Sequence, residues 1–361
     1  MDGLSSANCD WVAGMAISLF ERVAGALFGG RDVSADAAAE RELVADMIEL
    51  VVDEVEPRVR SYGSYRAKLD PCICKSIAYL RSIGRESWEP ILLTRAAWSD
   101  DPRVNAFFAT ADEVPACLGR STELRAFFEN PANSDVQEAY ALLGMKKEER
   151  TVLAPQLEGD ALKLDVPQVV VNFSEHRLIA PGPTLAATRL EAGRRIIRRL
   201  AQVALSRIIA LDMKATELQE HKAYLGARLR VLNLSRNGME GIVKDSATTA
   251  EEIKAVEREL KETVDGYIEA KTSLATLDGY IEHIDDVFSH PERHIAFNRT
   301  PLRVSRMGVK ASEATLGPIN ELNLAELVIG ENLRAAIAIV LCPRGEVPPK
   351  MDLVAKAERY L

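Results

Sequence analysis

The sequence is poor in aromatic residues, which make up 6% of its 361 residues, and it has no excess of basic charge. Few aromatic rings are therefore available for stacking against nucleic-acid bases or sugars. Lys and Arg number 45 against 54 Asp and Glu, a net charge of -9, so the chain as a whole repels nucleic acid and acidic membranes. We do not expect nucleic-acid binding, and any basic site must be local.

Common catalytic and phosphate-binding motifs are also missing. The sequence contains no G-x-G-x-x-G after a predicted strand, no G-x-x-x-x-G-K-[ST], no H-E-x-x-H and no G-x-S-x-G. These absences exclude the usual glycine-rich phosphate loops, the helical zinc-protease site and the nucleophile elbow. The sequence predicts no cofactor and names no reaction.

Five cysteines in an odd number, without regular spacing, do not form the disulfide framework of a small secreted domain. They are typical of a reducing compartment, and we predict a cytoplasmic protein.

The sequence contains no run of about 20 uncharged apolar residues, so we predict no transmembrane helix. The N-terminus also lacks the basic region of a secretion signal. Residues 11–28 have the spacing of an amphipathic helix. Its other face lacks the Lys and Arg that anchor interfacial helices, so we expect it to pack on its own domain and not on a membrane.

Residues 1–150 are acidic, with 17 Lys and Arg against 25 Asp and Glu. Hydrophobic periodicity predicts helices over residues 37–55, 74–83, 89–97, 121–129 and 134–143. Ser121 and Ser134 stand where N-caps are expected, and breaks rich in Gly, Asp and Pro separate the segments. The segments are too short to be stable alone, so we predict one acidic, all-helical domain over 1–150.

Strand signals lie on both sides of residues 184–289. The segment 166–180 is rich in β-branched residues and is bounded by prolines, which is typical of a strand or a strand pair. Residues 294–309 and 321–343 also predict strands, and Gly330 marks a turn between two apolar runs. A helix over 332–341 is an alternative, because Ala-rich runs are ambiguous. We predict a small β-rich domain formed by 160–182 and 292–345, followed by a tail or short helix over 346–361.

Two series of seven-residue repeats give the strongest signal in the chain. The first series consists of Leu190, Ile197, Ala204, Leu211, Leu218, Leu225 and Leu232. The second consists of Ile253, Leu260, Tyr267, Leu274, Ile281 and Phe288. A short Gly- and Ser-containing loop separates the two, which forces neighbouring helices to be antiparallel.

Charge supports pairing between these two helices. Residues 184–245 contain 12 Lys and Arg against 6 Asp and Glu, net +6, whereas residues 246–288 contain 4 against 11, net -7. We predict an antiparallel coiled-coil hairpin over 184–289, inserted in the β-rich domain. The predicted fold class is therefore α+β, predominantly α. The repeats can pair within one chain or between two chains, so a homodimer remains open.

Two clusters are candidate sites. Arg194, Arg195, Arg198 and Arg199 form a positive stripe suited to phosphate, RNA or an acidic protein surface. We favour pairing of this cluster with the acidic second helix, where Glu282, Asp285 and Asp286 would lie opposite it. The second choice is an acidic partner or the acidic N-terminal domain. Nucleic acid is the least favoured.

Three of the five histidines, His283, His290 and His294, fall within twelve residues. They could supply nitrogen ligands to zinc, but their spacing matches no established site. We favour a helix C-terminus at which the macrodipole attracts cationic groups.

We expect a non-enzymatic interaction or scaffold protein, because a projecting hairpin devotes many residues to reach and few to enclosing a pocket. The predicted contact residues at the tip of the hairpin are Arg236, Met239, Ile242, Val243 and Lys244. The competing hypothesis is an enzyme with a site in the N-terminal region that uses the coiled coil to dimerise. A concave site near Arg95, Asp100, Asp101 and Arg103 would favour that hypothesis.

Overall fold

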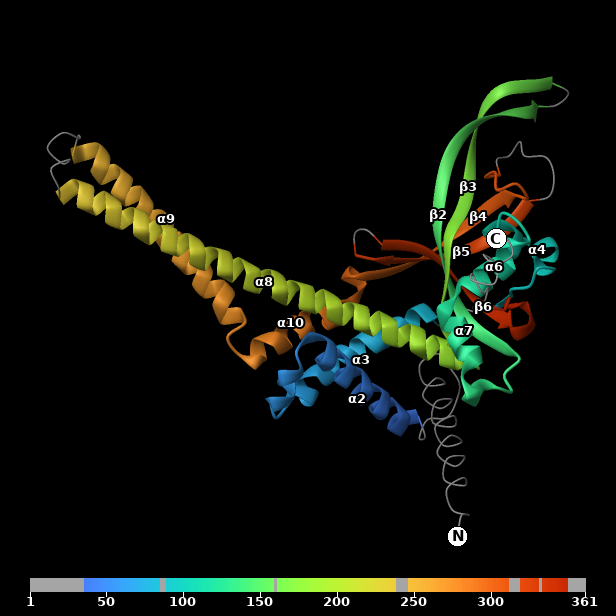
Figure 1. The fold of residues 1–361 in the computed structure, drawn as a ribbon, viewed down its shortest axis with the longest axis horizontal. Coiled ribbons are helices and arrows are strands. Elements are labelled where there is room, and N and C mark those ends of the chain that lie inside the picture. Colours follow the sequence, from blue (N-terminus) through green and yellow to red (C-terminus); the bar gives the residue numbers. More distant parts are fainter. Residues whose placement is uncertain are drawn as a thin grey trace, which may run out of the picture. The chain divides into compact units, whose positions relative to one another are not determined.

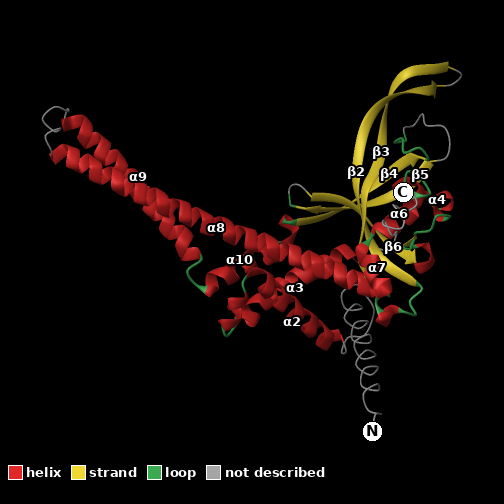
Figure 2. Ribbon diagram, viewed as in Figure 1, coloured by secondary structure: helices red, strands yellow, loops and turns green. Residues whose placement is uncertain are grey.

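The computed structural model describes residues 36–84, 89–158, 161–237, 246–311, 319–330 and 333–349. Within them the chain has the α+β class predicted from the sequence, with many helices and one mostly antiparallel sheet (Figure 2). The chain divides into two compact units. We call the described parts of Met1–Leu43, Ile77–Ile196 and Glu292–Leu361 the sheet unit, and Val44–Ser76 with Ile197–Pro291 the helical unit.

The sheet unit contains six strands within the described residues. They are β1 (Ile91–Leu92), β2 (Glu138–Glu158), β3 (Ala161–Gly182), β4 (Ile295–Ser305), β5 (Ile319–Ile329) and β6 (Leu333–Pro343). Their order is β3-β2-β6-β5-β4 with antiparallel neighbours, and β1 pairs with β6 in parallel. Residues beyond β4 also reach β3, because the Val171 amide donates to Gly308 O and the Lys310 amide donates to Val169 O, both at 2.8 Å.

Short helices cover this sheet. They are α4 (Ala97–Asp100), α5 (Pro102–Phe107), α6 (Glu113–Arg120), α7 (Thr122–Glu129) and the 3-10 turns η2 (Pro131–Asn133), η4 (Pro291–Arg293) and η5 (Arg344–Glu346). Ser121 caps α7 as predicted, since its hydroxyl accepts a hydrogen bond from the Leu124 amide at 3.2 Å. Apolar side chains of α5, α6 and α7 pack with those of β2–β6 in one buried cluster, which fixes the helices on the sheet.

The predicted strands are confirmed. Residues 166–180 lie in β3, and 294–309 contain β4. Residues 321–329 lie in β5 and 333–343 in β6, which pair antiparallel, and Gly330 directly after β5 has a positive φ of 61°. The helical alternative for 332–341 is wrong, because these residues lie in β6.

Two predicted helices are wrong, and the described part of 1–150 is not wholly helical. Residues 134–143 contain no α-helix, because β2 starts at Glu138 and pairs with both β3 and β6. Within 89–97 the chain forms β1 before α4 begins at Ala97. Ala, Leu and Met favour helices in isolation, but every second residue from Ala139 to Met145 is buried, and strand pairing overrides that propensity.

The long helices belong wholly or partly to the helical unit (Figure 1). They are α2 (Asp36–Val55), α3 (Tyr65–Gly84), α8 (Leu185–Asn237), α9 (Ser246–Ser273) and α10 (Leu277–Ser289), with the 3-10 helix η1 (Pro57–Ser61) between α2 and α3. The predicted helix over 37–55 is α2, which buries Leu43, Met47, Val51 and Val55 on one face. Pro57 follows that helix and opens η1, as a proline after a helix end does.

The second repeat series spans two helices and not one. Residues 274–276 interrupt it, and Leu274 lies in the break between α9 and α10. Thr276 caps α10 by accepting a hydrogen bond from the Gly279 amide at 3.3 Å. The prediction of one continuous helix to Phe288 is therefore wrong at this point.

Some predictions fall outside the described residues. These are the helix over 11–28, residues 350–361 of the predicted tail, and the tip residues Met239, Ile242, Val243 and Lys244. The structure follows the backbone of α8 through Arg236 but does not describe that side chain. None of the helices in the described ranges combines the length and the hydropathy needed to cross a membrane.

Candidate functional site

Helix α8 buries one face along much of its length. Residues of the first repeat series and their neighbours are buried there: Leu190, Ile197, Ala201, Ala204, Ile208, Ala215 and Leu225. On α9 and α10 the buried residues include Ile253, Val256, Ala270, Ile281, Ile284 and Phe288. Leu211, Leu218 and Leu232 of the first series, and Leu260, Tyr267 and Leu274 of the second, are only partly buried, so the seven-residue spacing coincides with the buried face in part.

Helices α8 and α9 lie side by side in opposite directions (Figure 1). Lys271 forms an ion pair with Asp212 at 3.8 Å, and the His221 ring lies 3.1 Å from a Glu259 oxygen. Residue numbers in these pairs rise along α8, from 212 to 221, and fall along α9, from 271 to 259, so the two helices run antiparallel. We call residues 208–237 of α8 together with α9 the helical arm.

The opposite face of α8 carries exposed apolar side chains. Ile209, Met213, Tyr224, Val231 and Leu234 are between 49% and 73% exposed. Ala227 is exposed between them. Successive helical residues are about 100° apart, so these six fall within about 80° of one another, opposite the buried face. We call Ile209, Met213, Tyr224, Ala227, Val231 and Leu234 the outer stripe.

The outer stripe is the surface that the sequence reasoning missed. Its residues do not belong to the repeat series, and the signal for it was apolar residues at i, i+4 and i+7 outside the heptad positions. Isolated exposed apolar residues are ordinary on a protein surface, but several on one helix face are typical of an interaction site. Here they form two groups, Ile209 with Met213 and Tyr224 to Leu234, with Glu220 between them.

Charged residues flank the outer stripe unevenly. Glu217 and Glu220 lie in its first half and Arg228 and Arg230 in its second half, and all four side chains are exposed. Within the described residues, Glu217 and Arg228 take part in no ion pair. The stripe therefore has an acidic end and a basic end.

The arginine cluster pairs with other carboxylates than those predicted. Arg195 forms a two-pronged ion pair with Glu123, at 2.8 and 3.0 Å, and also bonds Glu191 at 3.0 Å. Arg198 lies 3.7 Å from a Glu54 oxygen. On α10, Asp286 pairs with Arg207 of α8 at 2.6 Å.

These contacts change how the cluster can act. Hydrogen bonds to Glu123 raise the pKa of Arg195 above its ordinary value, although partial burial opposes the shift. Burial alone would raise the pKa of Glu123, but hydrogen bonds from Arg195 and the Ala180 amide outweigh it and lower that pKa. Arg194 also has an interaction partner, and the Arg199 guanidinium donates to the Gln202 side chain at 3.3 Å. Much of the cluster is thus engaged within the chain, largely by the acidic first 150 residues.

The three clustered histidines occupy different settings. His290 is the C-cap residue of α10, and its ring nitrogen lies 3.1 Å from Asp286 O. His283 lies within α10, whereas His294 follows η4 in the sheet unit. Over the part of the chain that the structure describes, no three His, Cys, Asp or Glu side chains are grouped as metal ligands would be. The structure therefore adds no support for a metal site here.

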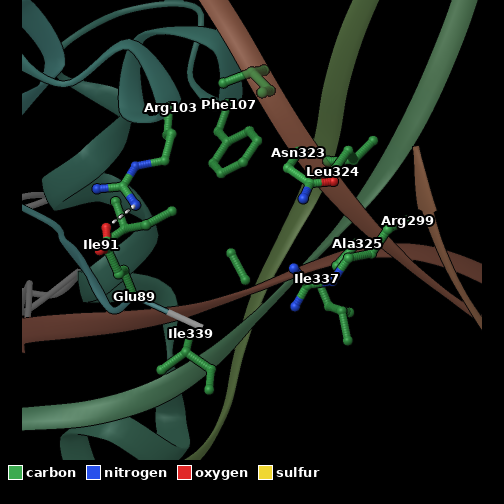
Figure 3. A pocket seen from close by; sticks show the side chains of 12 residues that line it. Glu89, Ile91, Arg103, Phe107, Arg299, Asn323, Leu324, Ala325, Ile337 and Ile339 are labelled. Carbon is green, nitrogen blue, oxygen red and sulfur yellow. Dashed lines mark ion pairs between the residues drawn. The ribbon is translucent and has the colours of Figure 1, made fainter. Parts of the chain in front are cut away.

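A cavity of about 330 Å³ lies in the sheet unit, beside the region that the enzyme hypothesis named (Figure 3). Arg103 and Phe107 of α5 face residues of β4, β5 and β6 across it, and the Arg103 guanidinium lies 4.0 Å from Glu89. A second, shallower hollow beside it is lined by Asp100, Asp101 and Arg103. Arg95 pairs instead with Asp112 at 2.8 Å on the surface.

The charged side chains that line this cavity are Glu89, Arg103 and Arg299. Arg103 is held by Asp101, whose carboxylate accepts hydrogen bonds from the guanidinium at 2.8 to 3.2 Å. That pairing raises the pKa of Arg103, partly opposed by burial. Burial would raise the pKa of Asp101, but bonding to Arg103 lowers it on balance. Among the described lining residues there is no Ser, Thr, Cys, His or Lys to act as a nucleophile.

Comparison of the chain with protein families, with curated proteins and with solved structures finds no match. Function must therefore be inferred from the surfaces of the chain itself.

Proposed function

We propose that this chain is a non-enzymatic protein-protein interaction or scaffold protein that binds through its helical arm. In this proposal α8 and α9 act as an antiparallel coiled coil that presents a partner-binding surface. The observation that carries the proposal is the outer stripe, a row of exposed apolar side chains on the face of α8 turned away from the buried repeats. An exposed row of this kind costs solubility unless a partner covers it.

The chemistry of the arm supports binding over catalysis. Two long helices devote many residues to a surface, and helix-in-groove or helix-on-helix contacts use apolar residues at i, i+4 and i+7. The cytoplasmic location belongs to the proposal too, because the four described cysteines, Cys72, Cys74, Cys117 and Cys342, are free thiols.

Substitutions on two faces of α8 test the proposal. Met213→Glu with Val231→Glu places two carboxylates on the outer stripe. Ala210→Glu with Gln219→Glu is the matched control, since it changes the charge equally at exposed positions outside the stripe. Each chain is immobilised and exposed to lysate, and far-UV circular dichroism checks that it is folded. We expect partners held by the wild type and the control to be lost from the stripe variant. The same proteins on all three chains would contradict the proposal.

The tip predicted from the sequence is tested separately. Replacing residues 236–246 by a short turn removes Arg236, Met239, Ile242, Val243 and Lys244 and leaves most of the outer stripe in place. If the tip is the contact, partners are lost from this variant and retained by the stripe variant. The reverse result assigns binding to the outer stripe.

Small-molecule binding in the sheet unit is a second candidate, favoured by the cavity at Arg103 (Figure 3). A volume of about 330 Å³ lies at the lower end of the range for ligand sites. A screen of metabolites by thermal shift tests it, with Arg103→Ala as the variant. A compound that stabilises the wild type and not the variant would support this function and revive the enzyme hypothesis.

A further inference from the structure

We infer that the outer stripe binds a second copy of the same chain, with the two α8 helices antiparallel about a two-fold axis near residue 222. This inference rests on the proposed function, since it names the partner of the proposed surface. It is carried by the placement of apolar and charged residues on that face, which is self-complementary in one direction only.

The apolar residues of the outer stripe are arranged symmetrically about that position. Met213 and Val231 each lie nine residues from position 222, and Ile209 and Leu234 lie thirteen and twelve residues from it. In an isologous antiparallel pair, Met213 of one copy therefore lies opposite Val231 of the other, and Ile209 opposite Leu234. Each exposed aliphatic side chain of one helix then meets one of the other helix.

The charges agree with the same axis. Glu217 and Arg228 lie five and six residues from position 222, on opposite sides of it, and are without an ion-pair partner among the described residues. Antiparallel pairing brings Glu217 of each copy toward Arg228 of the other, twice in the dimer. Parallel pairing would instead place Glu217 against Glu217 and Arg228 against Arg228, which is repulsive. The signs of Glu217 and Arg228 thus favour the antiparallel arrangement over a parallel one in the same register, whereas the two Glu220 side chains, each two residues from the axis, oppose it.

The surroundings of the stripe favour a protein over a lipid surface. Interfacial helices flank their apolar face with Lys and Arg, whereas Asp212, Glu217 and Glu220 lie beside or within this one. Acidic groups at these positions oppose contact with anionic lipid. Glu217 suits a partner that has a basic group at matching spacing, which Arg228 in the second half of the same stripe provides.

The size of the surface sets the expected strength. Residues 209–234 span about 38 Å of helix, and a strip roughly 10 Å wide is small beside the standard protein interface. The dimer is therefore expected to be weak and concentration-dependent, with a Kd in the micromolar range or above, on the order expected for small interfaces.

Sedimentation velocity of the full chain, over concentrations up to about 300 µM, tests the inference, because an interface at the weak limit is still populated there. Glu217→Arg and Arg228→Glu each place like charges together twice per dimer, and each is expected to raise the Kd roughly tenfold. The double variant, Glu217→Arg with Arg228→Glu, restores opposite signs and is expected to return the Kd to within about threefold of the wild type.

The outcomes separate this inference from the proposed function. A chain that stays monomeric throughout the concentration range overturns the dimer, while loss of a lysate partner from Met213→Glu with Val231→Glu would still support the interaction function. A dimer that this stripe variant leaves unchanged forms through another surface and overturns the inference. Weakening by both single charge reversals without recovery in the double variant overturns the antiparallel register.

Discussion

Gly279 lies in the first turn of α10, three residues after the break at 274–276 that separates this helix from α9. A Cβ at this position would overlap the carbonyl oxygen of Ser273, because the chain folds back on itself at Thr276. Backbone cannot yield as a flexible side chain can, so the close approach requires glycine. Gly226, within α8, meets no such constraint, because a Cβ added there would have no neighbouring atom within 4 Å.

Gly279→Ala is therefore expected to lower the free energy of unfolding by about 1–3 kcal/mol, the usual cost of forcing an atom into packed structure. Gly226→Ala is the matched control and should raise it by about 0.5–1 kcal/mol, because alanine favours a helix interior. Urea unfolding followed by circular dichroism measures both. Equal effects of the two substitutions would show that Gly279 is not needed for the break.

Glu49 on α2 joins that helix to η1 and α3. Its carboxylate accepts hydrogen bonds from the Tyr65 hydroxyl at 2.6 Å, the Arg60 guanidinium at 2.9 Å and the Arg66 guanidinium at 2.7 Å. These hydrogen bonds lower the pKa of Glu49 from 4.5 to about 2, and the bond from Tyr65 contributes most. Burial opposes the shift. The ionised carboxylate therefore stabilises the folded chain.

Because the pKa is lowered on folding, this stabilisation is complete above about pH 5 and is lost as the pH falls toward 2. Glu49→Gln should reduce the free energy of unfolding at pH 7 by about 1 kcal/mol, since solvent screens a partly exposed site. The difference from the wild type should shrink between about pH 4.5 and 2. Glu42→Gln, on an exposed position of α2, serves as control. A difference that does not depend on pH would contradict the assignment.

The β2–β3 hairpin extends beyond the sheet that anchors it. Pairing of β2 with β6 ends at Met145, whereas β2 and β3 stay paired to Glu158 and Ala161. The outer part of this hairpin is exposed, including Leu153 at 66% and Leu164 at 70%. Over 164–170, where the structure describes side-chain burial in the outer part of β3, no residue is buried, and the first buried residue is Val171.

Removing residues 152–168 and joining Thr151 to Val169, which are register partners, through an Asn-Gly turn should leave the sheet unit folded. The contact of Val169 and Val171 with residues 308–310 is retained in this variant. We expect the free energy of unfolding to change by less than about 1 kcal/mol, as for surface changes generally. Loss of cooperative unfolding would show that the outer hairpin supports the sheet.

The elements with a local signal were predictable. The face of α2, the Ser121 cap of α7 and the turn at Gly330 each follow from spacing or from a residue with a specific backbone role. β2 was not predictable, because its alternation of small and large apolar residues also fits a helix until a partner strand is known. The break before Gly279 depends on Ser273, six residues away, and the sequence pattern continues through it.

The candidate site was predictable only in part. The repeats predict which residues of α8 and α9 are buried, because a heptad pattern specifies a face. The repeats do not specify whether other elements also pack on the remaining faces of α8. The exposure of the outer stripe depends on that packing. The partners of the arginine cluster also needed the fold, because Glu54 and Glu123 are far from Arg198 and Arg195 in sequence.

At the scale of the whole molecule, the acidic first 150 residues and the basic start of α8 are not separate features. Arg195 with Glu123, and Arg198 with Glu54, take up part of the positive charge of residues 184–245. The acidic charge of the second repeat segment is therefore not the only charge that balances the basic charge of residues 184–245. Its contacts with α8 include Asp212 with Lys271, in which the signs are the reverse of the overall charge of each segment. Net charge per segment did not predict these individual pairs.

A shortened chain tests whether the helical arm is an addition to an otherwise complete fold. Asp212 and Lys271 form an ion pair at 3.8 Å, so a short Gly-Ser loop can join the chain there in place of residues 213–270. The Arg207–Asp286 pair and the buried residues of α10 lie on the retained side of this cut. Because the sheet unit has its own buried cluster, we expect amide exchange of β6 and α10 in the shortened chain to match the full chain. Binding through the outer stripe should be lost at the same time. Faster exchange in β6 would mean that the arm stabilises the sheet unit, and the interaction surface would then not be separable from the fold.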